Sequence, residues 1–122
     1  MKKTISDREC DDAKQLIEKL DLKYNITFLH WWKQDKTFKL IIVIDNYNSL
    51  DKKQVKNDIS KEISNIGITS FDSSDCEPSD SSILEKPLRG LMSMPSKEFL
   101  KIEFENSSVN GLQIDHTVIL RA

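Results

Sequence analysis

A run of five consecutive aliphatic residues, Leu40 to Ile44, constrains this 122-residue chain more than any other feature. Successive side chains of a strand point to opposite faces of a sheet, so an unbroken aliphatic run predicts a strand that is buried on both faces. The segment before it, Ile26 to Trp32, is a second predicted strand, and the four polar residues Lys33 to Lys36 connect the two. We therefore expect a hairpin whose second strand lies inside a sheet.

Two segments carry apolar residues at helical spacing. The first begins at a capping box, in which Ser6 and Glu9 each bond the backbone amide of the other. The second, Leu50 to Ile66, ends at Gly67, the residue type that most readily closes a helix. Each segment predicts a helix with one buried face. The two apolar stripes are Cys10, Ala13, Ile17 and Leu20, and Val55, Ile59, Ile63 and Ile66.

Three later segments read as strands. They are Ile68 to Phe71, Phe99 to Glu105, and Leu112 to Leu120. Asn110-Gly111 is a type I′ turn signal, which predicts that the last two strands form a hairpin. Before them, Asp72 to Ser82 has the composition of an exposed loop. In Ile83 to Met94 a proline and a glycine interrupt a helical pattern, so this segment predicts a turn or two of helix at most.

These elements predict one domain, residues 1–122, of the α+β class. The order is helix, strand, strand, helix, strand, strand, strand, and two helices on one face of a mainly antiparallel five-stranded sheet form a two-layer sandwich. The other face of the sheet is expected to carry Leu29, Trp31, Ile41 and Val43. An apolar patch of this size is rarely left in water, so we expect Ile83 to Met94 or a second copy, in a homodimer, to cover it.

Charge is distributed unevenly along the chain. The net charge is only -2, but Glu62 to Glu85 contains six acidic residues and no Lys or Arg. An acidic loop of this kind can steer and orient a basic partner. We therefore expect a protein-binding module, of the kind that inhibits a toxin or nuclease as an immunity protein does, rather than an enzyme. Its expected contacts are Asp72, Asp75, Glu77 and Asp80, with Trp31 as an anchor.

A different surface supports an alternative function. Aromatic faces interleaved with positive charge are suited to stacking on single-stranded bases, which predicts an RNA- or ribosome-associated domain. The helix lysines in this set are expected to form a basic pole opposite the acidic loop. The residues concerned are Trp31, Lys33, Lys36, Lys52, Lys53 and Lys56.

The sequence assigns no catalytic residue, cofactor or metal ligand. Three glycines are too few for a glycine-rich phosphate loop, which excludes the common nucleotide-binding motifs. His30 and His116 alternate with apolar neighbours and are expected to be hydrogen-bonded core residues. Cys10 and Cys76 are expected to be free thiols. If the chain were an enzyme, Asp45 with either histidine would be the first residues to test.

The N-terminus begins with two lysines, as a secretory leader does, but charged residues follow at once and no apolar segment appears. No stretch approaches the roughly 20 apolar residues that span a bilayer. We expect a cytoplasmic protein without a membrane partner.

The first half of the chain has a familiar layout. A helix, a hairpin that ends in the aliphatic strand Leu40 to Asp45, and a second helix follow one another. This succession resembles the first domain of the ribosome maturation factor RimP. The residues after Gly67 lack the serine-serine-proline-glycine signature of that family, so the resemblance is one of layout alone.

Overall fold

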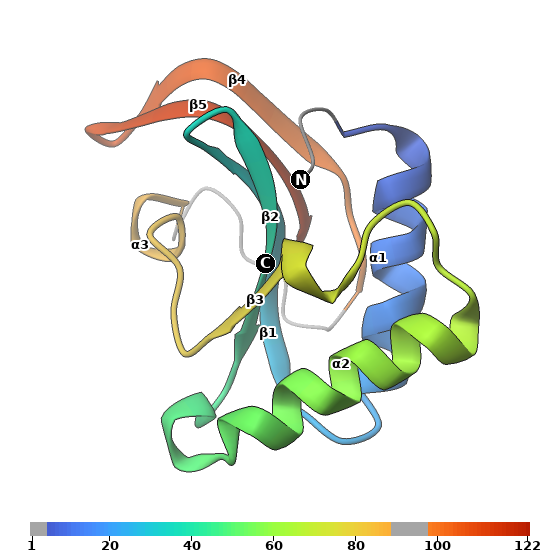
Figure 1. The fold of residues 1–122 in the computed structure, drawn as a ribbon. Coiled ribbons are helices and arrows are strands. Elements are labelled where there is room, and N and C mark those ends of the chain that lie inside the picture. Colours follow the sequence, from blue (N-terminus) through green and yellow to red (C-terminus); the bar gives the residue numbers. More distant parts are fainter. Residues whose placement is uncertain (1–4, 89–97) are drawn as a thin grey trace.

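The computed structural model describes residues 5–88 and 98–122 and has an α+β fold. Five strands form one sheet in the order β3-β2-β1-β5-β4, in which only the β2/β3 pair is parallel. Two long helices, α1 and α2, lie on the same side of this sheet (Figure 1). The predicted fold class and element order are confirmed. The long helices and strands are α1 (Asp7–Leu20), β1 (Ile26–Gln34), β2 (Thr37–Ile44), α2 (Lys52–Ile66), β3 (Cys76–Ser79), β4 (Ile102–Val109) and β5 (Leu112–Arg121), with single turns of helix at η1 (Tyr47–Ser49), η2 (Ser73–Asp75) and α3 (Glu85–Leu88).

Helix α1 begins at its predicted capping box, and helix α2 ends at its predicted glycine. At the start of α1, the backbone N–H of Ser6 donates to the Glu9 carboxylate over 2.9 Å. Helix α2 starts at Asp51, whose carboxylate accepts from the amides of Lys53 and Gln54, and ends at Gly67, where φ is +83°. That left-handed conformation is easy for glycine and costly for other residues. None of the described helices is long and apolar enough to cross a membrane.

The register of β1 and β2 divides their side chains between the two faces. Trp31 pairs with Leu40, and Leu29 pairs with Ile42. All four side chains are buried in the cluster that also contains the apolar stripes of α1 and α2. Leu29 and Trp31 therefore lie under the helices, and their predicted place on the opposite face was wrong. Leu29 and Trp31 are odd-numbered residues of β1, and the hairpin register places even-numbered residues of β2 beside them on the same face.

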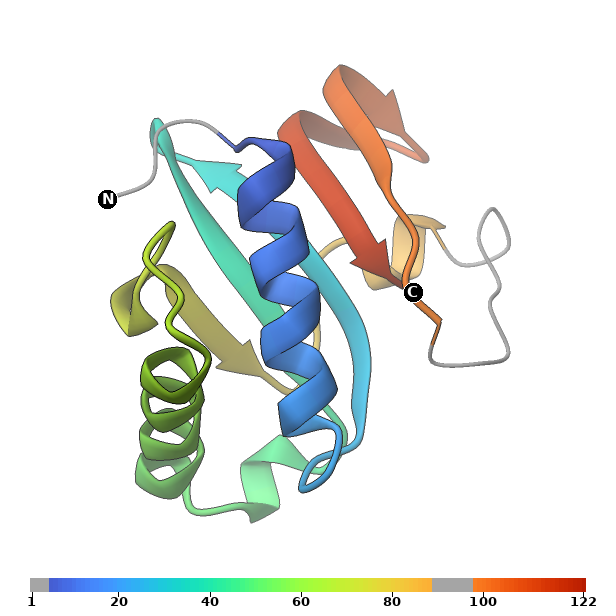
Figure 2. The ribbon, with the colours of Figure 1, turned by 90° about the vertical axis from the view of Figure 1, so that its right-hand side faces the viewer.

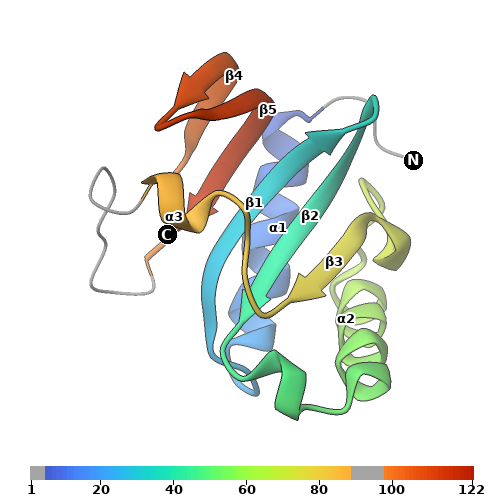
Figure 3. The ribbon, with the colours of Figure 1, turned by 90° about the vertical axis from the view of Figure 1, so that its left-hand side faces the viewer.

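The opposite face has a smaller core. Phe28, Ile41 and Val43 lie there with Ile114 and Ile119, and Leu84, just before α3, is fully buried against them. Figure 3 shows the segment that leads into α3 crossing this face of the sheet. The predicted lid over Ile41 and Val43 therefore includes Leu84. The rest of the predicted lid segment, 89–94, lies outside the described residues.

The third strand is not where the sequence placed it. Ile68 to Phe71 forms no strand, although both end residues are buried. The Phe71 ring packs edge-on against Trp31, with 5.3 Å between the ring centroids. Strand β3 comes later, within the predicted acidic loop. Helix α2 carries the chain back across the sheet, as a connection between parallel strands requires, so β3 runs parallel to β2 at the sheet edge.

Both hairpins close with two residues in the left-handed region. Asn110 and Gly111 have φ of +46° and +86°, as the type I′ signal predicted. Asp35 and Lys36 have φ of +53° and +71°, so the first hairpin turns in two residues rather than the predicted four. Figure 2 shows the β4–β5 hairpin beside α1. Strand β4 starts at Ile102, later than the predicted Phe99.

Candidate functional site

Three of the four predicted acidic contacts lie together at the β3 edge of the sheet. Asp72 precedes the strand, Glu77 lies in it and Asp80 follows it, and all three are exposed. Asp75 is only 5% exposed, and its carboxylate accepts the backbone N–H of Asp72 over 3.1 Å. Asp75 therefore shapes the turn and does not face a partner. We refer to Asp72, Glu77 and Asp80 as the acidic edge.

Local hydrogen bonds fix two members of the acidic edge. The Asp72 carboxylate accepts from the hydroxyl and the backbone amide of Ser74, and these bonds hold the pKa of Asp72 below its usual range. Asp80 accepts from the side-chain amide of Asn48 over 2.8 Å. The position of each of these two carboxylates is therefore restricted, and this limits the entropy lost when a partner binds.

An open groove of about 620 Å³ borders the acidic edge. One wall comes from α2 and the other from η2 and β3. Lys39 also lies there, and its ammonium donates to the carbonyl oxygen of Ser74 over 2.6 Å. The groove is lined by Lys39, Tyr47, Lys56, Asn57, Ile59, Ser60, Ser73, Ser74, Cys76, Glu77 and Pro78.

The groove brings opposite charges together. Lys56 on α2 and Glu77 on β3 line the same space. The predicted arrangement, with the α2 lysines opposite the acidic residues, was wrong in this respect. Because β3 lies beside α2 at the sheet edge, the first turns of α2 border the acidic edge instead of opposing it.

The residues predicted to bind RNA do not form one surface. Trp31 is 0% exposed, so it can neither stack on a base nor anchor a partner, and both of its predicted roles conflict with the structure. Trp32, its neighbour, is the half-buried indole. Lys33 lies near the end of β1 and Lys36 in the turn before β2, whereas Lys52, Lys53 and Lys56 lie in α2, after the end of β2. Figure 3 shows the β1–β2 turn and α2 at opposite ends of β2. The eight residues of β2 span about 26 Å between the two groups.

His30 is fully buried between two hydroxyl groups on the lid face. Thr117 donates its hydroxyl hydrogen to the carbonyl oxygen of Trp31 over 2.6 Å, so it must accept from His30 Nδ1, which is 3.1 Å away. His30 Nε2 is then the acceptor for the Ser82 hydroxyl at 2.7 Å. Burial lowers the pKa of His30 to about 3, so the ring is neutral over the physiological range.

The Ser82–His30 contact resembles a nucleophile and its base, but the surroundings indicate a structural role. Ser82 accepts the amide of Leu84 over 3.2 Å, and its own amide donates to Glu85 over 2.7 Å, as in a helix-capping box. The hydroxyl thus joins the turn that carries Leu84 to the ring inside the sheet. His30 confirms the prediction of a hydrogen-bonded core histidine, and its contact with Ser82 links the sheet to the lid.

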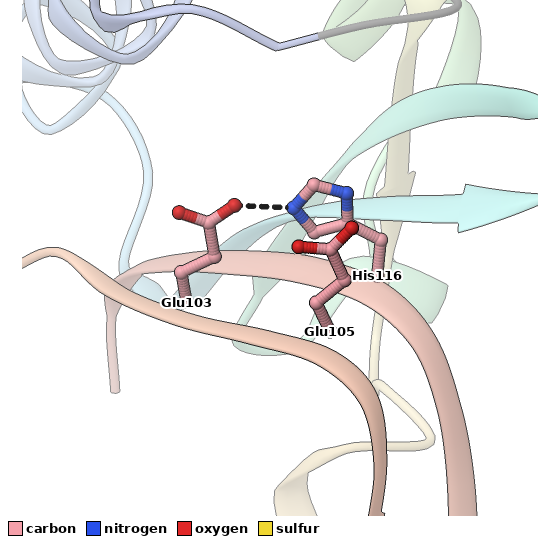
Figure 4. Close-up of side chains that lie close together, drawn as sticks. All are labelled: Glu103, Glu105 and His116. Atoms are coloured by element: carbon pink, nitrogen blue, oxygen red, sulfur yellow. Dashed lines mark hydrogen bonds and ion pairs between the residues drawn. The ribbon is translucent and has the colours of Figure 1, made fainter.

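His116 has a different environment on the β4–β5 hairpin. It pairs with Glu105 across the strands, Glu103 lies two residues before Glu105 in β4, and the three side chains converge (Figure 4). His116 Nε2 is 2.5 Å from a Glu103 oxygen, and one ligand atom from each residue lies within 4.8 Å of the others. Among the described residues, this is the one group of three or more His, Cys, Asp or Glu side chains that close together.

Sequence reasoning missed this cluster although the signal was present. The two-residue turn at Asn110-Gly111 fixes the register of the hairpin. Counting back from that turn places Glu105 opposite His116, and alternation puts Glu103 on the same face. The prediction that His116 is a core residue holds in part, since its ring packs edge-on against buried Phe38 at 5.1 Å.

The remaining candidate residues stay apart. Asp45 is exposed at the end of β2 and accepts from the side-chain amide of Asn25 over 3.3 Å; among the described contacts it touches neither histidine. Cys10 and Cys76 are free thiols, as predicted. Burial, followed by the neighbouring Asp75, raises the pKa of the Cys76 thiol, so it is a poor nucleophile at neutral pH.

Comparison of the chain with protein-family models, with curated proteins and with solved structures found no match.

Proposed function

We propose that this chain is a protein-binding module whose acidic edge docks against a basic surface of another protein, in the manner of an inhibitor or immunity protein that neutralises a toxin or nuclease. The observation that carries the proposal is the set of three exposed carboxylates along the sheet edge, beside an open groove. Enzymes that act on nucleic acids present a positively charged cleft to phosphates, and such a cleft is complementary to this edge.

The groove adds a condition on the partner. Lys39 and Lys56 line it, so the partner needs basic side chains opposite Glu77 and polar or acidic groups opposite the two lysines. A uniformly basic surface would meet repulsion from the groove. Mixed complementarity of this kind favours one protein partner over a polyanion such as RNA, because like charges face to face exclude wrong partners.

The test is affinity capture from the native host with three forms of the full chain. The edge variant carries Asp72→Asn, Glu77→Gln and Asp80→Asn, and keeps a cap at position 72 because asparagine also caps helices. A control variant carries the same number and kind of changes at exposed positions elsewhere: Asp11→Asn, Glu18→Gln and Asp35→Asn. Each capture is made at low and moderate salt, with and without ribonuclease.

The proposal expects one stoichiometric protein that is retained by the wild type and the control and lost with the edge variant. Retention should fall as salt rises, because screening weakens exposed charge pairs. Capture that is the same with all three forms would contradict it. Recovery of RNA that is indifferent to the edge variant would instead favour the alternative function.

A further inference from the structure

The geometry points to a binding site for a divalent transition-metal ion, of the zinc class, formed by Glu103, Glu105 and His116 on the outer hairpin. Two carboxylates and one imidazole on the same face of two paired strands converge to within 4.8 Å (Figure 4). Zinc sites that keep an exchangeable position are commonly built from three such nitrogen and oxygen ligands.

The charges of the cluster favour a cation. His116 makes its contact with Glu103, and the carboxylate of Glu105 has no cationic partner among the described residues. Lys101, two residues before Glu103, is bonded to Asp7 at the start of α1, although its charge also acts on Glu103. Two carboxylates therefore lie beside one imidazole, and a divalent ion would compensate the excess negative charge.

The site is open enough for an ion to enter. The side chain of Glu103 is 50% exposed and that of His116 is 18% exposed. In a tetrahedral zinc site, ligand atoms about 2.0–2.1 Å from the metal are about 3.4 Å from one another. The Glu103–His116 distance of 2.5 Å must therefore lengthen when the metal binds.

The kind of metal follows from the donors. An imidazole nitrogen is a ligand for zinc and the later transition metals, whereas magnesium and calcium take oxygen ligands almost alone. His116 is also held in place, since its ring packs against Phe38. A ligand that is oriented before the metal arrives loses little freedom on binding. We therefore expect Zn²⁺ to bind and Mg²⁺ and Ca²⁺ to bind much more weakly.

Few other groups compete for zinc. The chain has two histidines and two cysteines in all. His30 is buried with both ring nitrogens bonded to hydroxyls, Cys10 is buried, and burial raises the pKa of Cys76. A stoichiometric, His116-dependent zinc site therefore reports on the hairpin cluster.

The test is calorimetric titration of the tag-free full chain with Zn²⁺ alone at neutral pH. The wild type should bind one ion, and His116→Gln should weaken binding at least about tenfold. Glu103→Gln and Glu105→Gln should each weaken it as well. Asp115→Asn, on the same hairpin but paired with Lys33, is the matched control and should leave the affinity within about twofold.

Two outcomes would overturn the proposal: no binding by the wild type, or equal affinity in the wild type and His116→Gln. Circular dichroism of each variant checks that it folds, and Glu105→Gln, at an exposed position, keeps the test decisive if His116→Gln does not fold. The edge variant should bind zinc as the wild type does. The two proposals can therefore fail independently.

Discussion

The buried centre of the sheet and the outer β4–β5 hairpin each hold one of the two histidines, and the two rings have opposite kinds of partner. His30 lies between hydroxyls of Ser82 and Thr117, which satisfy a neutral ring. His116 lies beside carboxylates of Glu103 and Glu105. Both residues alternate with apolar neighbours in the sequence. The comparison shows that the partners that the fold places around each ring, and not the apolar alternation that both residues share, determine what a histidine does.

Burial makes the central contacts hard to replace. A polar group enclosed in protein that loses its partner retains its desolvation cost, whereas an exposed group returns to water. The centre should therefore be sensitive to single substitutions that the hairpin tolerates. The predictions below test this contrast, beginning with the largest expected effect.

Arg121 provides the largest expected effect. It is 2% exposed, and its guanidinium donates to both oxygens of Asp21 over 2.8 and 2.9 Å, which ties β5 to the end of α1. Arg121→Met should lower the free energy of unfolding by about 3 kcal/mol, because Asp21 then keeps a partly buried charge without its partner. Urea denaturation measures this change.

The matched control for Arg121→Met is Lys101→Met, which removes the exposed ion pair with Asp7. Exposed ion pairs contribute little to stability, so Lys101→Met should lower the free energy of unfolding far less than Arg121→Met does. An equal loss of unfolding free energy in the two variants would contradict the contrast between buried and exposed contacts.

His30→Gln is expected to cause the second-largest loss of stability. The substitution leaves at least one of the Ser82 and Thr117 hydroxyls without the ring nitrogen that it bonds, at a cost of about 1–3 kcal/mol. The lid should loosen at the same time, so amide exchange at Leu84 and Glu85 should speed up. A variant as stable as the wild type, with unchanged exchange at the lid, would show that His30 does not hold it.

The pH dependence of that loss tests the neutral state of His30. The unfolded ring titrates near pH 6.5 and the folded ring near pH 3, so the stabilisation from the neutral ring is complete above 6.5 and declines as the pH falls towards 3. Between pH 6.5 and 5, the stability gap between wild type and His30→Gln should narrow by about 2 kcal/mol. A gap that stays constant over this range would mean that the folded ring takes up a proton like the unfolded one.

His116→Gln is expected to have the smallest effect on the metal-free protein. Its side chain is partly exposed, and glutamine can still contact Glu103, so the change should be about 0.5 kcal/mol or less. Added Zn²⁺ should raise the melting temperature of the wild type and not that of the variant, since a ligand stabilises the state that binds it. Thermal melts with and without zinc measure both effects.

Local signals predicted much of the fold because they act between near neighbours. The Ser6–Glu9 capping box, Gly67 at the end of α2 and the Asn110-Gly111 turn lie where the sequence placed them. The aliphatic run of β2 fixed a central strand. Strand β3 was missed because its four residues carry no alternating apolar pattern, and its pairing depends on where α2 returns the chain.

The candidate sites were less predictable, because most of their contacts join residues that are far apart in the sequence. The His30 contacts join residues 52 and 87 positions apart, which only the strand order β1-β5 and the lid bring together. Trp31 was predicted to contact a partner, but strand alternation alone does not say which of the two adjacent indoles is buried. The hairpin cluster was the exception, since the turn alone fixes its register.

Nitrogen-15 NMR of the two imidazoles tests the contrast most directly, because one sample reports on both rings. The account predicts that His30 shows a protonated Nδ1 and an unprotonated Nε2, unchanged between pH 7 and 5 and unchanged by Zn²⁺, while one equivalent of Zn²⁺ shifts the His116 resonances. A His30 ring that responds to zinc or takes up a proton in this range, or a His116 ring that ignores zinc, would contradict it.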